Sequence, residues 1–260
     1  MQGADLIVEV EDGVCWLFIN RPEKMNSITM ATVGEIGDEL RRFETDTNVR
    51  AMVIAGVGGR AFSTGVDLST MADGSSFFDM HQARSALGDL FGQMWRYPKP
   101  IVAMVDGYAL AGGFGLAAAC DFVIASQESK FGLPEINVGV WPFLITVPLL
   151  RSINPRILLE LMMTGRRIDA SEALRIGVLN WVVPRADLEK ATRSHLQELT
   201  SKSSAILALG KASFYRAMEM DSSAALGYLQ AMLSLVTQLE DAREGLDAFS
   251  QRRDPVWRHR

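Results

Sequence analysis

The stretch "RAMVIAGVGGRAFSTGVDLS" (residues 50–69) decides between two kinds of fold. Its apolar run, residues 51–55, suits a buried strand, and closely spaced glycines follow it. The spacing G-x-G-x-x-A that begins at Gly56 is similar to a dinucleotide-phosphate loop. Such a loop requires glycines that open a helix and an acidic residue after a second strand. The following residues are instead rich in Ser, Thr and Gly, and Asp79 lies inside a helical pattern, so we reject a dinucleotide site.

The overall composition is that of a globular protein with a large core. Apolar residues make up 48% and charged residues 22% of the 260 positions. A formal net charge of −5 argues against a nucleic-acid partner, because binding to phosphates requires a concentrated basic surface. Cys15 and Cys120 lie in apolar stretches without metal-ligand spacing, which indicates reduced, buried thiols in a cytoplasmic protein and no metal site.

No segment of the sequence suits a membrane span or a signal peptide. The most apolar stretch, residues 107–120, is bounded by Asp106 and Asp121 and is shorter than the roughly 20 residues that a bilayer requires. The acidic start of the chain lacks the basic and apolar regions of a signal peptide. We therefore expect no membrane partner.

Strand patterns alternate with helical ones through about residue 190, and the rest of the chain is helical. This order predicts an α/β architecture with crossover connections, followed by an all-helical end. The expected strands cover residues 6–10, 14–20, 51–56, 101–107 and 121–126, and the expected helices before residue 100 cover 31–46 and 77–97.

A second glycine cluster gives the first indication of a chemical function. Gly112 and Gly113 follow an apolar strand and open a helix of small residues, and a helix N-terminus carries free N–H groups. The turn "STGVDL" (63–68) offers further N–H groups. Two N–H groups from separate loops form an oxyanion hole, in which each donor is worth about 2.7–4 kcal/mol. The alternative is that these glycines only permit tight packing of helix against strand.

These features together resemble the crotonase (enoyl-CoA hydratase/isomerase) superfamily. The resemblance covers nearly the whole chain and rests on "INRPEKMNSIT" (19–29), "GRAFSTGVDL" (59–68), "DGYALAGGFGLAAACDFVIAS" (106–126), "FGLPEINVG" (131–139), "TGRRIDASEALRIGVLNWVVP" (164–184) and "AREGLDAF" (242–249). It implies acyl-CoA substrates and a crotonase-like spiral of ββα units over residues 1–195. It also implies a helical oligomerisation region over residues 196–260 that builds homotrimers or homohexamers.

The resemblance also implies roles for individual residues. The two oxyanion donors fall on the backbone N–H groups of Val66 and Gly112. Arg252 is expected to meet the CoA phosphates from a neighbouring subunit, and the alternative is a solvated charge at a helix end. The remaining substrate and CoA contacts are expected at Lys24 and Met25 within residues 23–27, at the turn from Ala61 to Ser63, and at Asp67 and Gly113.

The acid/base residues depart from those of a two-glutamate hydratase. The second glutamate of such an enzyme falls on Glu135, a carboxylate among apolar residues, where burial raises a pKa toward the range useful for proton transfer. The first falls on Gly115, which has no side chain to hold water. Trp141 and Phe143 stand where hydratases have small residues, so they either line the acyl pocket or pack in the core.

One carboxylate and a drier pocket favour a proton shuttle. Glu135 would take the proton next to the thioester and return it at C4, which is a Δ3-to-Δ2 enoyl-CoA isomerisation without a metal or redox cofactor. The alternatives are an atypical hydratase, a decarboxylase or thioester hydrolase, and a catalytically degenerate CoA-thioester-binding protein. For the hydratase, the residues that could hold water are Asp67, Asp79, His81 and Glu128.

Overall fold

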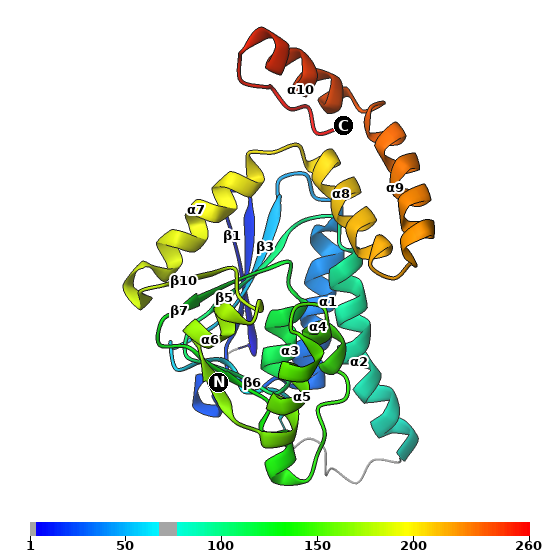
Figure 1. The fold of residues 1–260 in the computed structure, drawn as a ribbon. Helices are drawn as coiled ribbons and strands as arrows, with labels where there is room; N and C mark the ends of the chain where they lie inside the picture. Colours follow the sequence, from blue (N-terminus) through cyan, green and yellow to red (C-terminus); the bar gives the residue numbers. More distant parts are fainter. Residues whose placement is uncertain (1–3, 68–76) are drawn as a thin grey trace.

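The computed structural model describes residues 4–67 and 77–260, in which the strands form two sheets (Figure 1). The larger sheet has the order β1-β2-β3-β5-β7-β10, with β1 antiparallel and the other neighbours parallel. Its strands are β1 (Leu6–Glu11), β2 (Val14–Ile19), β3 (Ala51–Gly56), β5 (Ile101–Val105), β7 (Phe122–Ser126) and β10 (Trp181–Val183). The smaller sheet contains β4 (Ala61–Ser63), β6 (Tyr108–Leu110), β8 (Lys130–Gly132) and β9 (Arg167–Asp169), in that order.

The chain visits the two sheets in turn, so the expected ββα spiral is confirmed. One strand of the larger sheet is followed by one strand of the smaller sheet, and then by a helix. The units are β3, β4 and α2 (Phe77–Arg96), then β5, β6 and α3 (Gly112–Ala119), then β7, β8 and η3 (Pro134–Val138). Before them, β1 and β2 lead through η1 (Pro22–Lys24) into α1 (Met30–Glu44).

The hairpin at the start of the chain shows why these residues form a tight turn. Glu11 pairs with Val14, so the connection consists of Asp12 and Gly13 alone. Both have positive φ, 51° and 75°, as a two-residue turn matched to the twist of the strands requires. An Asp-Gly pair adopts this backbone with little strain.

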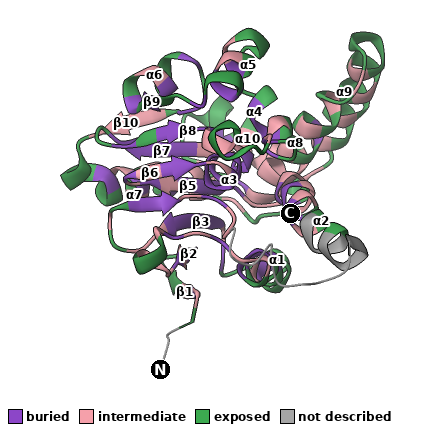
Figure 2. Cartoon of the chain, turned by 90° about the horizontal axis from the view of Figure 1, so that it is seen from below, coloured by how far each residue is buried: buried purple, intermediate pink, exposed green. Residues whose placement is uncertain are grey.

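Successive side chains of β2 point to opposite faces of the sheet and so belong to two different hydrophobic cores. Cys15, Leu17 and Ile19 join the main core, which also contains buried residues of α1, α2, α3 and α5 (Pro155–Thr164). Val14 and Trp16 face the opposite side, where they pack with residues of α7 (Leu188–Thr200) in a smaller core. Figure 2 shows that the buried residues concentrate on the strands and on the faces of the helices that cover them.

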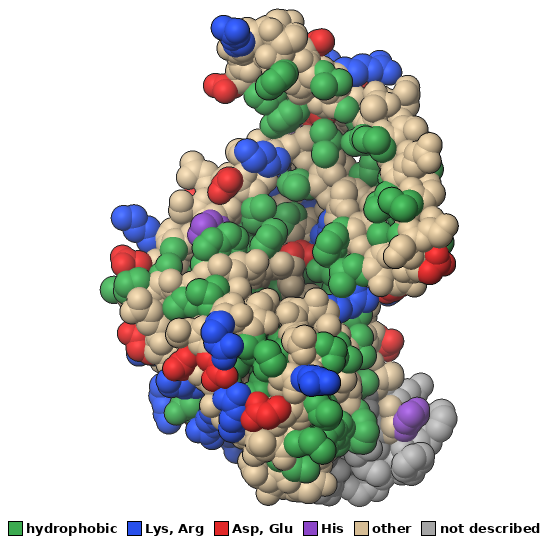
Figure 3. All heavy atoms as spheres, in the orientation of Figure 1, with side chains coloured by type: hydrophobic (Ala, Val, Ile, Leu, Met, Phe, Trp, Pro, Cys, Tyr) green, Lys and Arg blue, Asp and Glu red, His purple; other side chains and the backbone are tan. Residues whose placement is uncertain are grey.

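Three helices extend from this body as an arm (Figure 1). They are α8 (Ser204–Ala217), α9 (Ser222–Val236) and α10 (Glu240–Gln251), and the boundary expected after residue 195 falls inside α7. Hydrophobic side chains gather along α9 and below α10 (Figure 3), where Leu226 is 71% and Phe249 86% exposed. An exposed apolar surface of this extent is typical of an interface. Among the described residues, no helix is long and apolar enough to cross a bilayer.

A buried polar cluster fastens α8 to the larger sheet. The ammonium of Lys211 lies 2.7 Å from the carboxylate of Asp121, and both side chains are 11% exposed. Asp121 also accepts hydrogen bonds from the backbone N–H of Ile101 and from the hydroxyl of Tyr215, at 2.7 and 2.9 Å. Desolvation raises the pKa of Asp121 and the contact with Lys211 lowers it. The arm is thus held to the body by a charge pair whose carboxylate accepts hydrogen bonds from residues of α8 and β5.

Tyr215→Phe is expected to lower the free energy of unfolding by about 1.5–3 kcal/mol, because it removes a hydrogen bond to a buried charged group. Tyr228→Phe is the matched control, since the Tyr228 hydroxyl has no hydrogen-bond partner in the part of the chain that the structure describes. Urea unfolding of both variants measures the difference. Equal midpoints for the two variants would show that the contact with Asp121 contributes nothing.

Candidate active site

Three parallel strands of the smaller sheet bring the candidate residues to one edge. β4 pairs with β6, and β6 with β8, so that Leu110 lies beside Gly132. The carboxyl ends of parallel strands lie on the same side of a sheet, where α/β proteins place their ligands. The segments that follow these ends carry Val66, Gly112 and Glu135. Residues that are far apart in the sequence are therefore gathered by the ββα repeat itself.

The N–H group of Val66 is free because of a single β-bridge. Ile28 donates its N–H to the carbonyl of Gly65 and accepts the N–H of Asp67, at 2.8 and 2.9 Å. In this parallel pattern Ile28 bonds to both neighbours of Val66, so the N–H of Val66 points away from Ile28. Among the described residues this N–H has no hydrogen-bond partner.

The N–H group of Gly112 has no hydrogen-bond partner in the described part of the chain, because Gly112 opens a helix. Gly112 is the first residue of α3, and the first N–H groups of a helix lack intrahelical partners. The loop of Val66 lies against it: a Cβ built on Gly65 would be 2.7 Å from the nitrogen of Gly112, and one built on Gly112 would be 3.4 Å from the nitrogen of Val66. Two unpaired amides from separate loops thus lie side by side.

Backbone strain marks the entrance to α3. Ala111, the residue before Gly112, has φ 49° and ψ −129°, a conformation that L-residues rarely adopt. Its N–H donates to the carbonyl of Gly132 at 2.9 Å, and its carbonyl accepts the N–H of Gly115 at 3.1 Å. Strain of this kind persists where the surrounding structure imposes it, and it gathers at functional sites. Here these bonds fix the start of α3 relative to the end of β8.

Glu135 combines partial burial with an unpaired oxygen. It lies in η3, three residues after Gly132, and its Oε2 is buried with no hydrogen-bond partner among the described residues. Burial raises the pKa of this carboxyl above its usual value, and a hydrogen bond from the residue's own backbone N–H offsets part of that rise. A carboxylate with one buried, unpaired oxygen and a raised pKa is suited to proton transfer.

The expected CoA contacts before α1 lie in a loop that polar side chains attach to the Val66 segment. Met25 and Asn26 both have positive φ, 53° and 54°, while Lys24 is exposed. Arg21 donates to the carbonyl of Ser27 at 2.8 Å and pairs with Asp67 at 3.0 Å. Asp67 therefore acts in this structure as an anchor for the loop.

Residues 61–63 do not form the expected turn. Ala61–Ser63 is the strand β4, and its side chains are buried. The amide of Asn26 donates to the carbonyl of Ala61 at 2.6 Å, and the hydroxyl of Ser63 accepts the N–H of Gly65 at 3.1 Å. A Cβ on Gly113 would overlap the carbonyl oxygen of Ser63. The expectation of a turn is wrong because this short segment pairs with β6, and its role in CoA contact stays a prediction.

The space beside Gly115 is filled by an apolar side chain. A Cβ built on Gly115 would overlap Cγ2 of Ile145 and lie 2.5 Å from its Cβ, and Ile145 is 3% exposed. Trp141, from the same segment, is partly buried against the main core. Phe143 is 75% exposed, so within this chain it is not a core residue. A carboxylate at position 115 therefore has no room in this structure.

The remaining candidates lie on the surface or beyond what the structure describes. Arg252 ends α10 in a left-handed conformation and is exposed. The helix α10 lies at the far end of the molecule from α3 (Figure 1). Glu128 is exposed in the turn between β7 and β8, and His81 is exposed on α2. The side chain of Asp79 lies outside the described residues. None of these placements tests a role in binding water or CoA.

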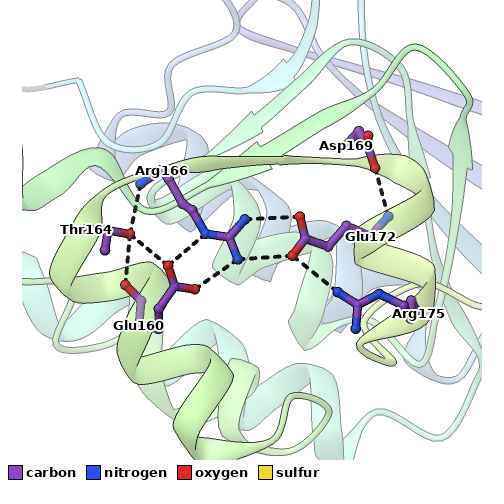
Figure 4. Close-up of polar contacts among 6 residues, drawn as sticks. All are labelled: Glu160, Thr164, Arg166, Asp169, Glu172 and Arg175. Carbon is purple, nitrogen blue, oxygen red and sulfur yellow. Dashed lines mark hydrogen bonds and ion pairs between the residues drawn. The ribbon is translucent and has the colours of Figure 1, made fainter.

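An ion network joins α5 to α6 (Ala170–Arg175) around the turn that follows α5 (Figure 4). The guanidinium of Arg166 lies between Glu160 at the end of α5 and Glu172 in α6, with contacts of 2.7 and 3.0 Å. The preceding residue, Gly165, has φ 64°, and a Cβ on it would be 2.9 Å from the side chain of Ile136. The turn that Arg166 holds therefore packs directly on the helix that carries Glu135.

Arg166→Met is expected to lower the free energy of unfolding by about 1 kcal/mol, because its partners are partly exposed and solvent screens the network. The loss should shrink at high salt. Arg175→Met is the control: Arg175 makes one exposed contact of 3.4 Å with Glu172. Urea midpoints at low and high salt measure both variants, and a salt-independent loss would contradict the electrostatic account.

Known proteins share both the sequence pattern and this arrangement. The enoyl-CoA hydratase/isomerase family model matches residues 9–260. The chain belongs to this family. Carnitinyl-CoA dehydratase of Escherichia coli K12 is 36% identical over 251 residues, which cover 93% of this chain and 94% of that protein. The mitochondrial enoyl-CoA hydratase domain-containing protein 3 of Rattus norvegicus is 34% identical over 251 residues, which cover 96% of this chain and 83% of the rat protein.

Solved structures of the family superimpose on nearly the whole chain. Human enoyl-CoA hydratase domain-containing protein 3 aligns with a TM-score of 0.93 and 30% identity, covering 98% of this chain and all of that one. An enoyl-CoA hydratase of Mycobacterium smegmatis aligns with a TM-score of 0.94 and 30% identity, covering 98% of this chain and 99% of that one. The crotonase-type fold is therefore established, and the chain is a hydratase/isomerase-like enzyme of that superfamily.

Sequence reasoning missed the residues that hold the site together. Arg21, Asn26 and Ile145 each act through a contact with a segment far along the chain. The only local signal was the unusual run of large apolar residues at 139–148, which pointed to a filled pocket without showing which residue fills it.

Proposed function

We propose that this enzyme shifts the double bond of 3-enoyl-CoA thioesters to the 2-position, with Glu135 as the single proton carrier. The observation that carries the proposal is the buried, unpartnered Oε2 of Glu135, at the same sheet edge as the free amides of Val66 and Gly112. A partly desolvated carboxylate with a raised pKa is suited both to accept and to return a proton.

The reaction follows from these groups. The thioester oxygen accepts hydrogen bonds from the amides of Val66 and Gly112, which stabilise the negative charge that develops on it. Glu135 removes a proton from C2, and the electron pair of the broken C–H bond forms the enolate. The same carboxyl then donates the proton to C4, so the double bond moves from C3–C4 to C2–C3. CoA is part of the substrate, and the proposal requires no metal or redox cofactor.

Hydration or dehydration of a CoA thioester is the second candidate. It is favoured by the names of two relatives, a carnitinyl-CoA dehydratase and an enoyl-CoA hydratase domain-containing protein. Addition of water in a two-carboxylate site requires a group at position 115, where Ile145 leaves no space. This contact is the reason for preferring isomerisation.

An activity screen with product identification tests the proposal. The purified protein is incubated with 3-enoyl-CoA, 2-enoyl-CoA and malonyl-type CoA esters, and the products are identified by mass spectrometry and NMR. We expect 2-enoyl-CoA from the first substrate and slow or no hydration of the second. Fast formation of 3-hydroxyacyl-CoA would support the hydratase instead, and binding without turnover would support a degenerate thioester-binding protein.

We propose further that copies of the chain associate through the arm as a homotrimer or homohexamer. The exposed apolar side chains of α9 and α10 support this assembly (Figure 3). It would also allow Arg252 to reach the CoA phosphates of a neighbouring subunit. Sizing in solution tests it, and a stable monomer would contradict it. A cytoplasmic location remains part of the proposal, although the rat relative is named as mitochondrial.

A further inference from the structure

Ile145 packs directly on Gly115 in α3, the helix whose first residue is Gly112. Glycine inside a helix such as α3 lowers stability by roughly 0.5–1 kcal/mol relative to alanine. At position 115 the missing side chain lets Ile145 lie directly on the helix backbone. Even alanine at position 145 would leave a Cβ only 2.5 Å from a Cβ at position 115.

The position of this pair relates it to the reacting carbons. Gly112 and Gly115 are three residues apart in α3, so they share one helix face, about 4.5 Å apart along the axis. The amide of Gly112 is the proposed donor to the thioester oxygen. A branched, buried hydrocarbon side chain on this face is an apolar wall next to the place where an enolate would form, and an apolar wall excludes water.

We infer that Ile145 is a specificity-determining residue, which excludes water and a second carboxylate from the site and so restricts the enzyme to internal proton transfer. This inference rests on the proposed function. Ile145 belongs neither to the acid/base group nor to the oxyanion donors. It would select isomerisation over hydration through its packing on Gly115, without carrying a charge.

The first experiment compares Gly115→Glu, Ile145→Gly and the double variant with the wild type. The measured quantity is the ratio of 2-enoyl-CoA hydration to 3-enoyl-CoA isomerisation. In the double variant we expect this ratio to rise about 100-fold, because the new carboxylate has room to act as a second acid/base group. Gly115→Glu alone should lose both activities. An equal gain in hydration from Gly115→Glu alone would overturn the inference, and so would a folded double variant with an unchanged ratio.

A second measurement requires no new charge. With a substrate deuterated at C2, the wild type should deliver much of the label to C4, because water cannot reach the protonated Glu135. Ile145→Ala should lower this retention several-fold. Leu149→Ala is the matched control, since Leu149 is fully buried in the neighbouring α4 (Thr146–Leu150) and has an equally large side chain to remove. It should leave the retention unchanged.

Two results of the label experiment would overturn the inference: complete loss of label in the wild type, and equal retention in Ile145→Ala and the wild type. Failure of the proposed function is distinguishable from both, because it appears as a wild type that forms no 2-enoyl-CoA at all.

Discussion

Glu135→Gln is expected to lower the turnover of 3-enoyl-CoA by about 10²–10⁴-fold, the range in which a positioned acid/base group contributes. Glutamine keeps the shape of the side chain but accepts no proton at neutral pH. The KM should change little, because the amides of Val66 and Gly112 remain in place. Steady-state kinetics with direct detection of the 2-enoyl product measures both constants. Unchanged turnover in the variant would remove Glu135 from the mechanism.

The same variant should be no less stable than the wild type. The Oε2 of Glu135 has no hydrogen-bond partner among the described residues, and desolvation raises its pKa in the folded state. A carboxyl whose pKa is raised on folding opposes folding once pH exceeds its unfolded value. At neutral pH, Glu135→Gln should therefore unfold at an equal or higher temperature. Lower thermal stability would show that the carboxylate makes a structural contact.

The pKa of Glu135 also predicts the pH dependence of turnover. Glu135 must be ionised to accept the proton from C2, so turnover falls as pH decreases through its pKa in the folded enzyme. Because burial raises that pKa, the acidic limb should lie above the ordinary range of a glutamate. A profile of kcat/KM against pH measures it in the free enzyme. An acidic limb at the value of an exposed glutamate would contradict the burial argument.

Gly65→Ala is expected to lower turnover by about 10²–10³-fold, which is the loss that removal of one oxyanion donor causes. Gly65 has φ 95°, and a Cβ there would lie 2.7 Å from the nitrogen of Gly112 and 2.8 Å from the Cβ of Ala111. These atoms belong to the backbone or lie next to it, so the two loops must separate and the amides with them. Kinetics of the variant give the loss in kcat.

Gly34→Ala is the matched control for this prediction. Gly34 lies in α1, and no atom is within 4 Å of the Cβ that alanine would add. It should leave turnover unchanged and raise stability by roughly 0.5–1 kcal/mol. The account would be wrong if Gly65→Ala, folded by circular dichroism, kept the wild-type kcat.

Five of the six strands of the larger sheet could be predicted from the sequence, whereas β10 and the smaller sheet could not. β3, β5 and β7 are five- or six-residue apolar strands with clear local patterns. β4, β6, β8 and β9 have three residues each, too few to show any period, and residues 61–63 were expected as a turn. These short strands position the candidate site, so its geometry could not be predicted, although candidate residues for it could be named.

The candidate site could be predicted only where a residue conflicts with its local surroundings. Glu135 stands out as a charge among apolar residues, and Gly112 as a glycine at a helix start. Ile145 is an apolar residue in an apolar segment, so its local sequence gives no signal. Its proposed role depends on its contact with Gly115, thirty positions earlier. The anchor of Arg21 on Asp67 spans 46 positions and has no local pattern either. Contacts of this kind are set by the fold.

A structure of the enzyme with a bound acyl-CoA would show directly how the thioester is held. We expect the thioester oxygen about 3 Å from both the Val66 and Gly112 nitrogens. We also expect the Glu135 carboxylate on one face of the acyl chain, within reach of C2 and C4, with Ile145 against the same carbons. A thioester oxygen bound away from these two amides, or a Glu135 carboxylate turned out of the site, would contradict the proposed mechanism.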